Sequence, residues 1–168
     1  MAYSTSVELY DVAEWHEMFV AAAGAAAALA GLVFVAVSIN VERILSFHGL
    51  PERALQTILL LLAAVVVSLI SLIPQSIEAL AVELLIGGIA LCVGVFIVTR
   101  AAFDTGGHPL WLVSRVGVLL PGSVPYLIAG VSLLVGAGGG LAWVALGLVG
   151  GMAGAVMNAW VLLVEILR

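Results

Sequence analysis

The sequence predicts an all-α integral membrane protein built as a bundle of five transmembrane helices. Of its 168 residues, 64% are hydrophobic and 9% are charged, against about 45–50% and about 25% in soluble domains. The mean hydropathy is +1.31. These values exclude an ordinary soluble domain, and they exclude a disordered chain, which needs low hydrophobicity and high net charge. Residues 1–168 are predicted to form one transmembrane domain, because the spans leave too few residues for another.

Charge-free runs define the predicted spans, since crossing about 30 Å of hydrocarbon takes roughly 20 apolar residues. The third run reaches this length when Glu83 is included in its first turns. The last run, 116–164, would extend about 73 Å as one helix, so it must turn back. The glycine-rich stretch 136–140 is the expected turn. The five predicted spans are about 17–44, 54–75, 79–100, 118–137 and 141–165.

The chain contains no lysine, and its arginines predict the orientation of the bundle. With five spans, every arginine falls on the same face, whereas the turns at 74–78 and 136–140 contain none. The positive-inside rule assigns that face to the cytoplasm. We therefore expect the N-terminus outside, as an uncleaved exported segment, and the C-terminus in the cytoplasm. The five arginines are Arg43, Arg53, Arg100, Arg115 and Arg168.

Charge and cysteine content also exclude several functions. The formal net charge is −5 and no basic patch exists, so nucleic acid is not an expected partner. The single cysteine, Cys92, excludes an intrachain disulfide and a multi-cysteine metal site. His16 and Glu17 lack the second histidine of a zinc-protease helix. No catalytic residue, metal ligand set or cofactor site is predicted, and the protein is expected not to be an enzyme.

Small residues predict where the helices pack, because helices in lipid associate through close van der Waals contact. The first span carries Gly24, Ala28 and Gly31 on neighbouring faces, so we expect this span to be central and tightly packed on two sides. The fifth span carries two overlapping Gly-x-x-x-Gly pairs, whose partners lie either in the same chain or in another copy. These pairs are Gly147 with Gly151 and Gly150 with Gly154.

Three polar residues inside the spans are candidates for a polar pathway, because intramembrane polar groups are costly and often mark function. Asn158 and Glu165 continue the glycine face of the fifth span, at offsets 11 and 18 from Gly147. Glu83 lies about one turn inside the third span. The alternatives are helix packing for Asn158, solvation or arginine pairing at the cytoplasmic interface for Glu165, and the outer interface for Glu83.

Four segments resemble a group of small hypothetical polytopic membrane proteins of high-GC bacteria. They are Trp15–Glu17, Gly24–Leu45, Gly49–Arg53 and Asn158–Leu167. The resemblance covers nearly the whole chain and is consistent with a multi-pass protein of the bacterial plasma (inner) membrane. Some members of such groups carry an automatically transferred label as modulators of a membrane AAA+ protease. The resemblance implies no catalytic residue.

Two functional hypotheses follow. The first is a non-enzymatic membrane scaffold or regulatory protein that self-associates, or packs against another membrane complex, through its glycine- and alanine-rich faces. The alternative is a homo-oligomeric ion channel or small transporter, favoured by Glu83, by the face of Asn158 and Glu165, and by kinks from Pro121 and Pro125. The channel ranks second because no selectivity filter or charge ring is present. The lipid bilayer and a second copy are the expected partners.

Overall fold

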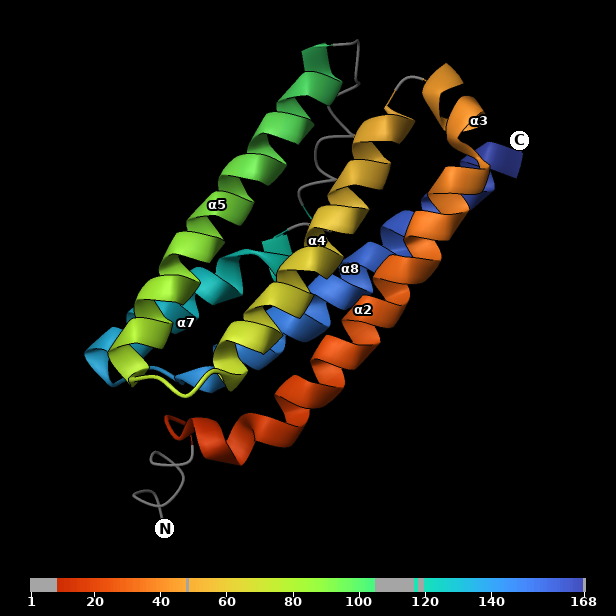
Figure 1. Cartoon of the computed structure of the whole chain (residues 1–168). Helices are drawn as coiled ribbons and strands as arrows, with labels where there is room; N and C mark the ends of the chain where they lie inside the picture. Colours follow the sequence, from red (N-terminus) through yellow and green to blue (C-terminus); the bar gives the residue numbers. More distant parts are fainter. Residues whose placement is uncertain (1–8, 48, 105–116, 118–119, 168) are drawn as a thin grey trace.

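The computed structural model describes residues 9–47, 49–104, 117 and 120–167 as an all-helical bundle (Figure 1). No strand occurs among these residues. Four of the described helical segments are long and apolar enough to cross a membrane, which confirms the predicted class of an all-α membrane bundle. These segments are Val12–Ile39, Leu50–Leu72, Ile77–Arg100 and Leu141–Glu165.

The first segment consists of a 3-10 turn, η1 (Val12–Trp15), that leads into α2 (His16–Ile39). The side chain of Asp11 caps η1 by accepting a hydrogen bond from the backbone N–H of Ala13 at 3.0 Å. The predicted span 17–44 does not continue as one helix, because the backbone leaves helical geometry at Asn40. A short helix, α3 (Val41–Ser46), follows at that end of the bundle.

The central helix is α4 (Leu50–Leu72), which packs against α2, α5 and α8. Gly49 precedes it in a left-handed conformation (φ 84°), which glycine adopts without steric cost, and Pro51 occupies the first turn. In the most apolar window of α4, 44% of residues are buried, compared with 11% in the segment that contains α2. The bundle is therefore organised around α4.

The fourth predicted span differs from the other four. After α5 (Ile77–Asp104), the described chain forms a 3-10 turn, η2 (Leu120–Gly122), and then α7 (Val124–Val135). With 12 residues, α7 extends about 18 Å, which is short of about 30 Å of hydrocarbon. The reason is Pro125: in a continuous helix its ring would clash with the carbonyl of residue 121. The prediction of five full-length helical spans is therefore not confirmed.

The turn before α8 (Leu141–Leu167) lies where the sequence predicts it. Gly136 ends α7 in a left-handed conformation, and three further glycines have positive φ angles: Gly138, Gly139 and Gly140. Such backbone geometry strains any residue with a Cβ atom. Four glycines in five positions therefore reverse the chain between two antiparallel helices.

The two ends of the bundle differ in charge. Arg43 in α3, Arg53 at the start of α4 and Arg100 near the end of α5 lie at the same end, named here the arginine end (top in Figure 1). The acidic end, at the bottom, contains the start of α2 and the turn between α7 and α8. Glu14 and Glu17 belong to it. Arg115 and Arg168 lie outside the described residues.

Candidate functional site

The glycine face of α8 packs against η2 and α7 of the same chain. A Cβ atom added to Gly122 would lie 2.7 Å from the Cα of Gly151, so the two backbones are in direct contact. A Cβ atom on Gly147 would lie 2.6 Å from the ring of Tyr126, and one on Gly150 would meet the carbonyl oxygen of Pro121. The first half of α7 is therefore held against the middle of α8 by close contacts that only glycine permits.

Of the four glycines predicted for packing on α8, Gly147, Gly150 and Gly151 lie at this contact, and Gly154 is buried. The sequence left open whether the partner was in the same chain or in another copy. Within the described residues, the partner is the half-length helix α7 together with η2.

The small residues of α2 are placed differently from the prediction. Gly24, Ala28 and Gly31 are exposed, and a Cβ atom on either glycine would have nothing within 4 Å. The inward face carries Phe19 and Ala26 instead, both 0% exposed. The expectation that this span is central and packed on two sides within the chain is therefore wrong.

The physical reason is the rotation of α2 about its axis. Phe19 fills the core at the acidic end, and α3 and Gly49 lead directly into α4 at the other end. At about 100° per residue, a face centred near residues 19 and 26 leaves Gly24 on the opposite side of the helix. The small-residue face thus points out of the bundle.

Buried polar side chains gather in the arginine-end half of the bundle, and we name them the polar cluster. Its members are less than 9% exposed: Arg53, Gln56, Thr57, Thr99 and Asn158. Gln56 is fully buried, and its Nε2 donates to the Thr99 hydroxyl at 3.0 Å. The Oε1 atom of the same side chain has no hydrogen-bond partner among the described residues. A buried acceptor of this kind favours a donor or a cation nearby.

Asn158 joins this cluster through the packing of α8 on α4. Gly151 lies beside Leu60, and the two helices run antiparallel. Moving seven residues along each helix from this contact brings Asn158 level with Arg53. Glu165 lies seven residues beyond Asn158 on α8, toward the arginine end. Its side chain is half-buried and interacts electrostatically with Arg53.

Glu83 lies at the other end of the molecule. Its Oε2 accepts a hydrogen bond of 2.8 Å from the side-chain amide of Gln75, which also donates to the carbonyl of Ile70 at 3.0 Å. This arrangement holds the turn between α4 and α5. Between Glu83 and the polar cluster lies an apolar layer that includes Leu61, Ala64 and Tyr126, each at most 1% exposed. The described residues of one chain therefore do not connect the three predicted polar residues.

Sequence reasoning missed Arg53, Gln56, Thr57 and Thr99. A signal for the first three was present, because positions 53, 56 and 57 lie on the same face of a helix that is otherwise apolar. Thr99 carries no such signal, since a threonine near a helix end is common and its partner is forty-three positions away. Only the packing of α5 on α4 brings Thr99 to Gln56.

A second polar arrangement missed from the sequence fastens the glycine turn at the acidic end. The Ser132 hydroxyl donates to the carbonyl of Ala137 at 2.6 Å and accepts from the N–H of Gly140 at 2.8 Å. The Tyr10 hydroxyl accepts from the N–H of Gly139 at 3.2 Å. These bonds satisfy backbone groups that the turn leaves without helical partners.

Among the described residues, no group of three or more His, Cys, Asp or Glu side chains is placed to hold a metal ion. No protein-family model, curated protein or solved structure matches the sequence. The resemblance to small bacterial membrane proteins stays a prediction from the sequence.

Proposed function

We propose that this protein is a non-enzymatic membrane scaffold or regulatory protein that self-associates through the outward face of α2. The observation that supports this most directly is the exposure of Gly24, Ala28 and Gly31 on the least buried of the long helices. Small residues at this spacing form a smooth surface on which a second helix can approach closely.

The composition of α2 is difficult to explain by lipid contact alone. Glycine inside a helix costs about 1 kcal/mol relative to alanine. On the exposed face of α5, Gly87 stands beside bulky residues such as Ile86, whereas every residue of α2 from Ala21 to Gly31 except Leu29 is alanine or glycine. The glycines of α8 are in close contact with α7, whereas Gly24 and Gly31 touch nothing in the chain. A second copy of α2 would provide the missing contact.

The proposal includes five crossings in a bacterial plasma membrane, with the N-terminus outside and the C-terminus in the cytoplasm. Helix α5 ends at the arginine end and α8 begins at the acidic end, so the chain must cross the bundle between them (Figure 1). In the half of the bundle nearer the acidic end, η2 and α7 make this crossing. The gathering of Arg43, Arg53 and Arg100 at one end supports a cytoplasmic assignment for that end.

The self-association is tested with Gly31→Leu in the full chain. Gly87→Leu is the matched control, because Gly87 is also exposed on a long apolar helix and has nothing within 4 Å of an added Cβ atom. Light scattering in mild detergent and energy transfer between labelled copies in vesicles measure the association. We expect Gly31→Leu to weaken it at least tenfold and Gly87→Leu to leave it unchanged. A monomeric wild type, or equal effects of both variants, contradicts the proposal.

The second candidate function, a homo-oligomeric channel or small transporter, is favoured by the buried polar cluster, in which Gln56 Oε1 has no hydrogen-bond partner within the part of the chain that the structure describes. Vesicles containing the protein and a potassium- or pH-sensitive dye test it. Ion flux that depends on protein and falls in Gln56→Leu would favour this function over the scaffold. Absence of flux in correctly folded wild-type protein would eliminate it for the ions used.

A further inference from the structure

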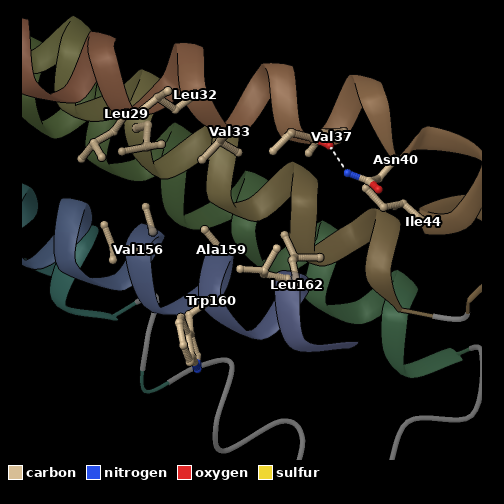
Figure 2. Close-up of a pocket in the computed structure, with 14 residues that line it drawn as sticks. Leu29, Leu32, Val33, Val37, Asn40, Ile44, Val156, Ala159, Trp160 and Leu162 are labelled. Carbon is tan, nitrogen blue, oxygen red and sulfur yellow. Dashed lines mark hydrogen bonds between the residues drawn. The ribbon is translucent and has the colours of Figure 1, made fainter. Parts of the chain in front are cut away.

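An apolar groove runs between α2 and α8 in the arginine-end half of the bundle (Figure 2). Its volume is about 360 Å³. Leu29, Val33 and Val37 of α2 point toward Val156 and Ala159 of α8 across the groove. Leu61 of α4 also lines the groove, and Ile44 of α3 lines the end of the groove that is nearest the arginine end of the bundle. The groove exists because α2 packs mainly on α4 and makes few contacts with α8.

The lining determines what can occupy the groove. Its polar groups are the side-chain amide of Asn40 and the indole N–H of Trp160, and the Nδ2 of Asn40 already donates to the carbonyl of Ala36 at 2.8 Å. A buried water needs two to four polar partners, so a row of waters would be poorly held. An occupant must therefore be apolar along most of its length.

The dimensions match a single lipid chain. The α2 side of the groove extends from Leu29 to Asn40, about 17 Å along the helix. This length is close to half of the roughly 30 Å hydrocarbon core, and so to the depth of one leaflet.

The charge at the end of the groove matches a lipid headgroup. Arg43 is exposed on α3 directly before Ile44, which lines the arginine end of the groove. A guanidinium binds phosphate through parallel hydrogen bonds, because its fork of N–H donors matches the phosphate oxygens. The groove thus combines an apolar channel of leaflet depth with a phosphate-binding group at its headgroup end.

We propose that this groove is a phospholipid site, in which one acyl chain lies between α2 and α8 and the phosphate contacts Arg43. The site is separate from the self-association face, because Gly24 and Gly31 lie on the far side of α2 from Val33 and Ala36. The bound lipid fills a space that the helices of the chain leave open.

The site is tested by reconstituting the full chain in vesicles of phosphatidylethanolamine and phosphatidylglycerol. These vesicles contain a small fraction of phosphatidylcholine with a diazirine in one acyl chain. After irradiation, peptide mass spectrometry locates the labelled residues. We expect Val33 and Ala159 to be labelled several-fold more than Ile86 and Ile89 of α5, which are exposed to lipid without a groove.

Two substitutions make the experiment specific. Ala159→Trp fills the groove, and we expect it to lower the groove labelling at least fivefold while labelling of α5 in the same sample is unchanged. Ala90→Trp places the same side chain on an exposed position of α5, and we expect it to leave groove labelling as in the wild type. The unchanged labelling of α5 in Ala159→Trp shows that this variant is inserted in the membrane, and far-UV circular dichroism compares the helix content of each variant with that of the wild type.

Arg43→Gln tests the headgroup contact. We expect the number of phospholipids retained in native mass spectrometry to fall by one in this variant and in Ala159→Trp, and not in Ala90→Trp. Equal labelling of the groove and α5 overturns the proposal. Labelling of Val33 that survives Ala159→Trp also overturns it, as does cross-linking of Val33 to a second copy of the chain, which would identify another helix as the occupant.

Discussion

The contact between Gly122 and Gly151 yields the sharpest test of the fold, because it places two backbones against each other. In Gly122→Ala, the new Cβ atom would lie 2.7 Å from the Cα of Gly151 and 2.9 Å from a methyl group of Leu60. The leucine can change rotamer, but the backbone of α8 can retreat only if the two segments separate. Overpacking of this kind costs about 1–3 kcal/mol. The unfolding equilibrium should then shift toward the unfolded state by roughly 5- to 150-fold.

The matched control is Gly87→Ala, where an added Cβ atom has open space. Replacing this helical glycine should stabilise the protein by up to about 1 kcal/mol. Titration with sodium dodecyl sulfate in mixed micelles, followed by far-UV circular dichroism, measures the free energy of unfolding of both variants. If Gly122→Ala is as stable as Gly87→Ala, then η2 does not lie against α8 and the placement of the half-length helix is refuted.

Three further predictions follow from other parts of the bundle. Ser132→Ala should destabilise the protein by about 1–3 kcal/mol in the same titration, because it leaves the buried N–H of Gly140 without an acceptor. The control is Ser38→Ala: the Ser38 hydroxyl is exposed on α2, so this variant should change the free energy of unfolding by no more than about 0.5 kcal/mol. Thr99→Val should destabilise the protein by about 1–3 kcal/mol, because it removes the hydroxyl that accepts a hydrogen bond from Gln56. The double variant Thr99→Val/Gln56→Leu should recover most of that stability. If the double variant is as unstable as Thr99→Val, the pairing of Gln56 with Thr99 is contradicted. Trypsin added outside intact cells should leave the protein uncut, and cleavage after Arg43 or Arg100 would refute the proposed orientation.

Properties that depend on local sequence could be predicted well. The length of an apolar run determines whether a helix can cross hydrocarbon, and the positions of Gly136–Gly140 determine where the chain can reverse. The shortening of α7 was also open to prediction, since Pro125 excludes a regular helical turn before it. The hydrophobicity of the run 118–137 does not reveal this interruption, because proline and glycine can break a helix without making the segment polar.

The side that each helix turns inward could be predicted in part. On α8, glycines in an otherwise bulky helix identify a single face, and that face is buried. On α2, nearly every position from Ala21 to Gly31 is small and apolar. The sequence of this segment therefore does not indicate which face of α2 is buried. Phe19 and the connections at either end of the helix determine that face.

The sequence by itself determined that this chain is a bundle of apolar helices able to cross a membrane, that Arg43, Arg53 and Arg100 lie at one end, and that glycine marks the close contact of α8. These properties follow from composition, helix length and the size of single side chains, which need no partner to be evaluated. The tertiary structure alone decided that α4 is central, that the glycines of α2 face outward, and that Gln56 meets Thr99. It also decided that a groove remains between α2 and α8. Each of these features depends on which helix face packs against which neighbouring helix. That packing is determined by contacts between residues far apart in the chain.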